Sequence, residues 1–267
     1  MKLNRGAVAA TAAFALTGLT TLTGAAPATA QEAAPAYVAL GDSYSSGLGA
    51  GSYDSGSGSC KRSAKAYPQL WSDANSPSSF DFTACAGART DDVINGQLGP
   101  LNDSTGLVSI SIGGNDAGFG DTMTTCVLKG ESACLQKVEQ AREYIANTLP
   151  GRLDSVYDEI RGKAPSAKVV VLGYPRMYQL EGQCNVGLSE KSRAAINSAS
   201  DDLNDVTAKR AADHGFTFGD VREGFTGHEI CSPAPWLHSV AYPVDESYHP
   251  TAEGQSGGYL PAMDGAA

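Results

Sequence analysis

Four residues of four different types stand at separate points of the chain where they could together perform acyl transfer. Ser43 follows a short apolar run in "AYVALGDSYSSG", and Gly87, Asn115 and His249 occur in "CAGART", "GGND" and "DESYHPTAEG". Each is ordinary when taken alone. A carbonyl under attack becomes an oxyanion, which needs preorganised hydrogen-bond donors, and serine is a weak nucleophile that needs a positioned base. The combination supplies all of these groups.

The residue types suggest how the roles divide. Ser43 is the expected nucleophile and His249 the expected base, because serine needs a neighbouring imidazole to take its proton. The backbone N–H groups of Ser43 and Gly87 and the side-chain amide of Asn115 are the candidate oxyanion donors. Glycine at position 87 lets the backbone approach a substrate closely. We expect ordinary solvated roles for the other histidines, which are His214, His228 and His238.

The elements that must position these residues are strands and helices in alternation. Continuous apolar runs, typical of strands buried on both faces of a parallel sheet, predict strands at 36–40, 80–85, 106–113, 167–175 and 215–221. This alternation predicts a layered α/β domain. In open parallel sheets, sites form at the carboxyl ends of strands, so Ser43, Gly87 and Asn115 are expected at one edge.

Helical patterns fill the intervals between the strands. They predict helices at 66–74, 134–162 and 189–215, with a kink or break at Pro150–Gly151 and Ser189 as an N-cap. The stretches 49–60 and 118–134 read as loops. The chain shows no internal repeat and no linker, which predicts one domain.

The residue blocks resemble a known family. "GDSYSSG", "GART", "GGND" and "ESYHP" are similar to the four conserved blocks of the SGNH, or GDSL, hydrolases, and most similar to those of extracellular Streptomyces lipases and esterases. The resemblance covers essentially the whole chain after residue 30. It implies a three-layer α/β/α flavodoxin-like fold with a central parallel sheet of about five strands. It also implies the roles given above for Ser43, Gly87, Asn115 and His249.

The sequence does not decide which group orients His249. Many family members carry Asp three residues before the histidine, but this chain has Glu246 there. Glu246, Asp245 or the backbone carbonyl of Ser247 are the three alternatives. The carbonyl is favoured, because related Streptomyces enzymes are thought to use a Ser–His dyad with a carbonyl. A carbonyl fixes the tautomer but stabilises the imidazolium less than a carboxylate.

The implied function is a secreted serine ester hydrolase, a lipase or esterase acting on acylglycerols and related lipids through an acyl-enzyme on Ser43, without metal or cofactor. The nucleophile elbow motif Gly-x-Ser-x-Gly is absent, because Ser45 stands where the motif has its second glycine. This absence argues against the α/β-hydrolase fold but not against hydrolysis.

Phospholipase A1 or B activity and carbohydrate acetylesterase activity are alternatives. The apolar residues of 49–60 and 118–134 favour a lipid chain. An inactive secreted binding protein is a remote alternative.

The N-terminal segment reads as an export signal. Lys2 and Arg5 precede a short apolar run, and Ala28–Thr29–Ala30 has the small residues of a cleavage site. A membrane anchor would need roughly 20 predominantly apolar residues. We therefore expect a signal peptide over 1–30 and a single domain over 31–267, secreted and without a membrane anchor.

Cysteine number and net charge fit an extracellular protein. An even number of cysteines in an oxidising compartment predicts disulfides, with fifteen pairings possible for six cysteines. Pairs of sequence neighbours are favoured, as in the family; a zinc site is disfavoured because no Cys-x-x-Cys occurs. These pairs are Cys60–Cys85, Cys126–Cys134 and Cys184–Cys231. The net charge of −10 argues against nucleic-acid binding, and nothing suggests an oligomer, so a monomer is expected.

Overall fold

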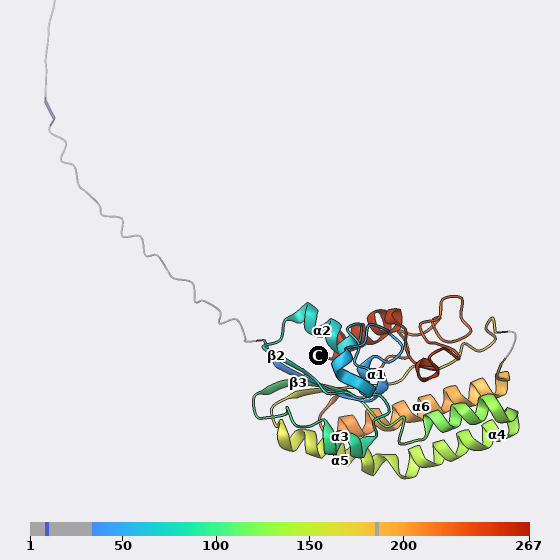
Figure 1. Cartoon of the computed structure of the whole chain (residues 1–267). Helices are drawn as coiled ribbons and strands as arrows, with labels where there is room; N and C mark the ends of the chain where they lie inside the picture. The colour runs from blue at the N-terminus through green and yellow to red at the C-terminus, as the bar shows by residue number, and fades with distance from the viewer. Residues whose placement is uncertain (1–8, 11–33, 185–186) are drawn as a thin grey trace, which may run out of the picture. The chain divides into compact units, whose positions relative to one another are not determined.

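The computed structural model describes residues 9–10, 34–184 and 187–267 of the chain (Figure 1). The predicted signal peptide, residues 1–30, lies outside the described residues except for residues 9 and 10. Within the described ranges, no helix is both long enough and apolar enough to span a bilayer.

A parallel sheet of five strands forms the centre of the fold, in the order β2-β1-β3-β4-β5. The strands are β1 (Ala36–Gly41), β2 (Ser79–Phe82), β3 (Thr105–Ser111), β4 (Lys168–Leu172) and β5 (Thr217–Gly219). All four pairings are parallel. The three central strands are almost entirely buried, which explains their continuous apolar sequence. The predicted α/β class and five-stranded parallel sheet are confirmed.

Helices cover both faces of this sheet. Figure 1 shows α3, α4, α5 and α6 on one face, and α2 together with the C-terminal segment on the other. The resulting three layers agree with the predicted architecture. The bounds are α1 (Ser43–Ser46), α2 (Tyr67–Asn75), α3 (Thr90–Gly96), α4 (Phe119–Asn147), α5 (Leu149–Lys163), α6 (Glu190–Asp213) and α7 (Leu260–Ala266), with the 3-10 turns η1 (Ser55–Cys60) and η2 (Val244–Glu246) and the π-helical η3 (Gly254–Tyr259).

The long helical stretch begins earlier than the sequence predicts. Residues 118–134 were expected as a loop, but α4 already starts at Phe119 and continues through a kink at Gly130, where φ is 77°. Glycine and threonine in this part are weak helix formers, so tertiary contacts and the disulfide between Cys126 and Cys134 must hold it. The expected break near Pro150 is present, because Pro150 lies in the first turn of α5.

Three disulfides link parts of the chain. They join Cys60 to Cys85, Cys126 to Cys134 and Cys184 to Cys231, the pairs of sequence neighbours named above. The first ties η1 to the loop after β2, and the third ties the segment before α6 to the loop that follows β5. These two bonds therefore hold connecting segments in place, whereas the second joins two parts of α4 on either side of its kink at Gly130.

Candidate active site

The four predicted site residues line one cleft at the carboxyl ends of the strands. Ser43 begins α1 directly after β1, Gly87 lies in the loop after β2, and Asn115 lies in the loop after β3. His249 comes from the C-terminal loop that follows η2. The sheet edge thus brings together residues that are far apart in sequence, as expected for an open parallel sheet.

The turn that carries Ser43 is fixed by its immediate neighbours. Gly41 has φ of 123°, and a Cβ there would lie 2.5 Å from the carbonyl oxygen of Ser111, so only glycine fits. The side-chain amide of Gln97 holds Gly41 from both sides: Oε1 accepts from its N–H at 2.7 Å, and Nε2 donates to its carbonyl at 2.8 Å. Asp42 caps α1 by accepting from the backbone N–H of Tyr44.

His249 joins Ser43 to a backbone carbonyl. Its Nε2 lies 2.8 Å from Ser43 Oγ, and its Nδ1 lies 2.9 Å from the carbonyl oxygen of Ser247. A carbonyl only accepts, so Nδ1 carries the proton and Nε2 is left to accept from the serine hydroxyl. The Tyr44 hydroxyl donates to the carbonyl of Tyr248 at 2.7 Å, which anchors the loop beside the imidazole.

The structure separates the three candidates for orienting His249. The carbonyl of Ser247 is at hydrogen-bonding distance from Nδ1. The carboxylate of Glu246 instead accepts from the Tyr53 hydroxyl at 2.7 Å. Asp245 is exposed on the outer rim of the cleft. The geometry thus favours the carbonyl alternative, and Glu246 serves to hold Tyr53 and the loop next to it.

The oxyanion donors converge on the same cleft. Gly87 has φ of 81°, and apart from its chain neighbours no atom lies within 4 Å of where a Cβ would stand, so the space at that position is open. Nδ2 of Asn115 donates one hydrogen to the carbonyl of Ala88 at 3.0 Å, which orients the amide and leaves its second hydrogen for a ligand. The neighbouring Asp116 accepts from Thr90 and fixes the loop.

Burial sets the charge state of the site. It lowers the pKa of His249 to about 4, and the nearby His238 acts in the same direction, so the imidazole is neutral at neutral pH and able to accept a proton. Burial also raises the pKa of Asp42 to about 6, partly opposed by hydrogen bonds from Tyr174 and Ser111. Among the described residues, no group of three or more His, Cys, Asp or Glu is placed to hold a metal ion.

A second, largely apolar pocket opens next to Ser43 between α4 and α6. Residues from these helices and from the segment after β4 line it: Phe119, Met123, Val138, Ile145, Met177, Ile196 and Leu203. Residues 118–134 thus contribute to the pocket as predicted, although as a helix. Residues 49–60 contribute only Ser59, and to the outer cleft.

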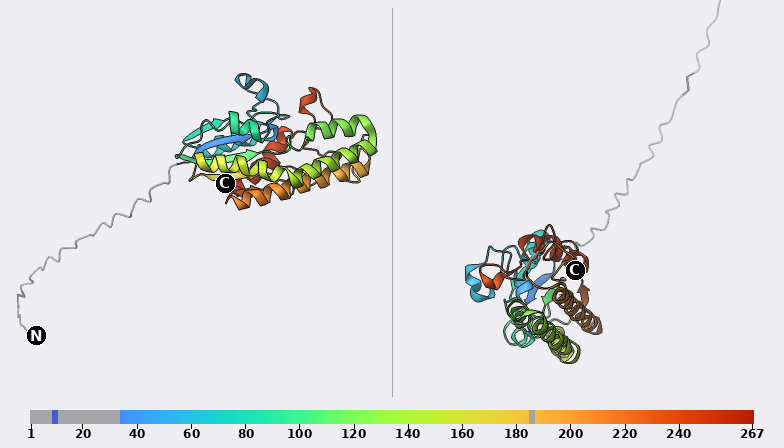
Figure 2. Two further views of the ribbon diagram at one scale, coloured as in Figure 1. Left: turned by 90° about the horizontal axis from the view of Figure 1, so that it is seen from below. Right: turned by 90° about the vertical axis from the view of Figure 1, so that its right-hand side faces the viewer.

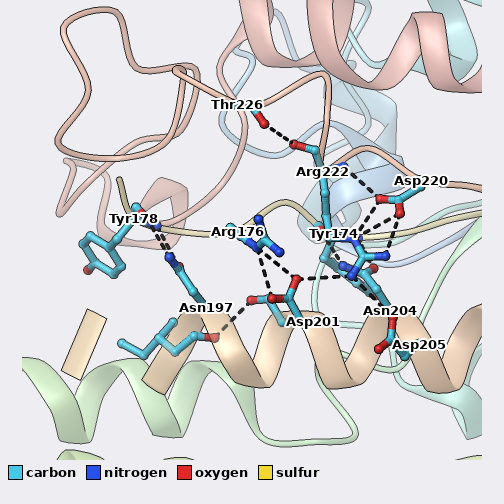
Figure 3. Close-up of polar contacts among 12 residues, drawn as sticks. Tyr174, Arg176, Tyr178, Asn197, Asp201, Asn204, Asp205, Asp220, Arg222 and Thr226 are labelled. Atoms are coloured by element: carbon cyan, nitrogen blue, oxygen red, sulfur yellow. Dashed lines mark hydrogen bonds and ion pairs between the residues drawn. The ribbon is translucent and has the colours of Figure 1, made fainter. Parts of the chain in front are cut away.

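Two asparagines of α6 bind the backbone of the segment that follows β4, as Figure 3 shows. Asn204 accepts from the backbone N–H of Tyr174 at 2.8 Å and donates to its carbonyl at 2.7 Å. Asn197 forms the same pair of bonds with Tyr178. Sequence reasoning missed these residues, and also Asp42 and Gln97. Only Asp42 carried a signal, since Asp before a helix start is a typical N-cap.

Comparison with known proteins agrees with the fold and places the chain in a family. A model of the GDSL-like lipase/acylhydrolase family matches residues 39–256. Lipase 1 of Streptomyces coelicolor is 66% identical over 257 residues, which cover 96% of this chain and 94% of that protein. The crystal structure of the extracellular lipase from Streptomyces rimosus is 68% identical, with a TM-score of 0.86 over 88% of this chain and 100% of its own.

The crystal structure of phospholipase A1 from Streptomyces albidoflavus NA297 is equally similar in fold. It is 65% identical, with a TM-score of 0.86 and the same coverage of both chains. The resemblance inferred from the sequence blocks is confirmed. The chain belongs to the GDSL-like lipase/acylhydrolase family.

Proposed function

We propose that this protein is a secreted serine ester hydrolase, a lipase or esterase that cleaves carboxylic ester bonds of acylglycerols and related lipids. The observation that carries the proposal is the chain of contacts from Ser43 through His249 to the Ser247 carbonyl, at the mouth of an apolar pocket. The nucleophile, a neutral base and a space for an acyl chain meet there.

The reaction follows from these groups. Ser43 Oγ attacks the ester carbonyl while His249 Nε2 takes its proton. The backbone N–H groups of Ser43 and Gly87 and the free amide hydrogen of Asn115 stabilise the oxyanion. His249 then protonates the leaving alkoxide, and an acyl-enzyme remains on Ser43. Water activated by His249 hydrolyses this intermediate through the same steps.

The Ser247 carbonyl acts through His249 and not on substrate. It keeps the proton on Nδ1, so that Nε2 always faces the nucleophile. A carbonyl stabilises the imidazolium less than a carboxylate does. We therefore assign the site a dyad, Ser43 and His249, with Ser247 as a positioning residue.

The proposal also covers the processing, the oligomeric state and the location of the protein. A leader over residues 1–30 is removed, and residues 31–267 act as a single, monomeric domain outside the cell. The extracellular lipase among its relatives and the three disulfides support this location. Phospholipase A1 activity is the second candidate, because a phospholipase A1 is 65% identical to this chain.

Substitution of the dyad tests the proposal. Ser43→Ala and His249→Ala should each lower kcat on p-nitrophenyl esters by at least about 10⁴-fold, because the two residues act as a unit. His228→Ala is the matched control, since this ring stacks on Trp236 outside the cleft and should leave kcat unchanged. Near wild-type turnover by a folded Ser43→Ala variant would refute the assignment.

Substrate class needs a separate comparison. Hydrolysis of tributyrin, phosphatidylcholine and acetylated xylan by the wild-type protein should rank the two lipids above the polysaccharide, because the pocket is apolar. Labelling of Ser43 by a fluorophosphonate probe distinguishes an enzyme from an inactive binding protein. An unlabelled Ser43 would favour the latter.

A further inference from the structure

Exposed apolar side chains gather at the mouth of the catalytic cleft. Among the described residues, the large hydrophobic side chains that are exposed are Val127, Leu128, Leu180, Val240, Tyr242 and Val244. All of them except Leu180 belong to the two segments that face each other across the cleft. Such a concentration on a soluble protein marks an interaction surface.

The two segments are the first half of α4 and the loop that contains η2. Val127 and Leu128 come from α4, and Val240 and Val244 come from the loop; all four line the outer cleft together with Ser43 and His249. The left view of Figure 2 shows the red η2 loop projecting beside the first green turns of α4. We call these four residues together with Tyr242 the rim.

Tyr242 is the most exposed member of the rim. Its side chain is 98% exposed, and it stands between Val240, at 63%, and Val244, at 73%. A fully exposed ring at the tip of a loop contributes nothing to the core. It presents apolar surface to whatever approaches the cleft.

The rim loop is held firmly against the catalytic machinery. Glu246 accepts from Tyr53, Ser247 Oγ accepts from the backbone N–H of Ala241 at 2.9 Å, and His238 Nε2 lies 2.8 Å from the carbonyl of Gly49. The same loop leads directly into His249. A surface that contacts the rim is therefore placed at a fixed position relative to Ser43.

The charges around the rim select the kind of surface. Lys61 and Asp245 are the charged residues that line the outer cleft, one of each sign. The whole chain carries a net charge of −10. An anionic surface would gain no local attraction and would be repelled at longer range. An uncharged or zwitterionic lipid surface meets no such opposition, and its acyl interior matches the apolar rim.

We propose that the rim inserts into the surface of uncharged or zwitterionic lipid and sets the catalytic cleft against it. This inference rests on the proposed lipid-ester hydrolysis and names where its substrate is met. An acyl chain then passes from the lipid surface along the rim into the pocket beside Ser43 without crossing water. Burial of the rim side chains supplies the binding free energy.

Depth-dependent quenching tests the insertion directly. Tyr242→Trp and Leu180→Trp are made in the Ser43→Ala background, so that the vesicles are not hydrolysed, and are mixed with brominated phosphatidylcholine vesicles. Both carry the native Trp71 and Trp236, which cancel in the comparison. We expect quenching and a blue shift for Tyr242→Trp only. Equal quenching of both variants, or none, would overturn the proposal.

A variant on the other segment of the rim shows whether an effect of Tyr242 substitutions comes only from a local change in the η2 loop. Leu128→Ser lies on α4, a different element, and is 74% exposed. In the Ser43→Ala background, Leu128→Ser and Tyr242→Ser should each partition about five- to tenfold more weakly onto phosphatidylcholine vesicles. Leu180→Ser should bind like its parent. Loss only in Tyr242→Ser would confine the effect to one loop and refute a rim that spans both segments.

Kinetics separate this inference from the proposed function. Tyr242→Ser should lose about five- to tenfold in activity on phosphatidylcholine vesicles and keep its kcat/KM on water-soluble p-nitrophenyl acetate. Equal loss on both substrates would place Tyr242 in the catalytic site and overturn the inference. Wild-type protein that hydrolyses the soluble ester but ignores vesicles would overturn it as well, while leaving the esterase assignment intact.

Two further outcomes exclude other occupants. Stronger binding to phosphatidylglycerol than to phosphatidylcholine vesicles would show docking through cations and refute the choice of surface. A lipid-free dimer that Tyr242→Ser converts to monomer in size-exclusion chromatography would show that the rim is covered by a second copy of the chain. We expect neither result.

Discussion

At the scale of single residues, the site depends on an imidazole that stays neutral. The ring of His249 is half-buried beside Ser43, and its Nδ1 proton is held by a carbonyl with no full negative charge. Nothing in this surrounding favours the charged form strongly enough to offset the loss of hydration. In the proposed reaction, the base is therefore ready to accept a proton before substrate arrives.

The pH dependence of activity follows from that burial. The pKa of His249 is lowered to about 4, so the neutral, active form persists as pH falls through 6.5, the pKa of an ordinary histidine. We expect kcat/KM on a soluble ester to remain flat through this range and to decline only as pH approaches 4. The acid limb of kcat/KM reports the free enzyme. A decline centred near 6.5 would contradict the prediction.

Residue type points to the proposed reacting groups more readily than to the residues that support them. The proposed roles follow from the side chains themselves, or from the lack of one, for Ser43, Gly87, Asn115 and His249. Ser247 acts through its backbone carbonyl, which every residue has, so the sequence left three alternatives open there. The structure was needed to place that oxygen at Nδ1.

At the scale of elements, side-chain amides complete hydrogen bonding where the sheet ends. Gln97 pairs with both backbone groups of Gly41, just as Asn204 pairs with those of Tyr174. Gln255 does the same between two helices, where it accepts from the N–H of Tyr67 in α2 and donates to the carbonyl of Tyr44 in α1. Backbone that leaves a sheet edge loses its strand partners, and buried groups must find others. These amides allow loops at the catalytic edge to be buried.

Removal of one amide should be costly. Gln97→Leu leaves the buried N–H of Gly41 without a partner, which should lower the free energy of unfolding by about 1–3 kcal/mol. It should also lower kcat, because Gly41 lies two residues before Ser43. Urea unfolding and steady-state kinetics measure the two effects. Gln69→Leu, at an exposed position on α2, is the control; an equal effect in both variants would refute the specific role of Gln97.

Element type was predictable where burial alone decides it. The strands β1, β3 and β4 are continuous apolar runs because both faces are covered. The first half of α4 escaped prediction, because its glycines and threonines favour no helix by themselves. Its conformation depends on packing and on the Cys126–Cys134 bond, neither of which local sequence reveals.

At the scale of the whole molecule, the disulfides differ in how much chain they close. Cys184–Cys231 has a sequence separation of 47, and Cys126–Cys134 a separation of 8. A longer closed loop restricts the unfolded chain more, by roughly 1.5 kcal/mol for this difference in length. Fold stability should therefore depend more on the Cys184–Cys231 bond.

Paired serine substitutions test this ranking. Replacing Cys184 and Cys231 together should lower the free energy of unfolding by about 1–2 kcal/mol more than replacing Cys126 and Cys134 together. Urea unfolding of both double variants, followed by tryptophan fluorescence, gives the comparison. An equal or reversed order would show that native-state contacts, rather than loop length, decide the contribution of each bond.

The two members of the dyad are 206 residues apart in the chain. A ribosome that has completed all five strands, through Gly219, has made the proposed nucleophile but not yet its proposed base. No nascent chain can attack an ester before its last segment is synthesised and folded back onto the sheet. The order of synthesis thus delays the onset of hydrolysis. The cell that makes the enzyme is exposed to its activity only after the chain is complete and folded.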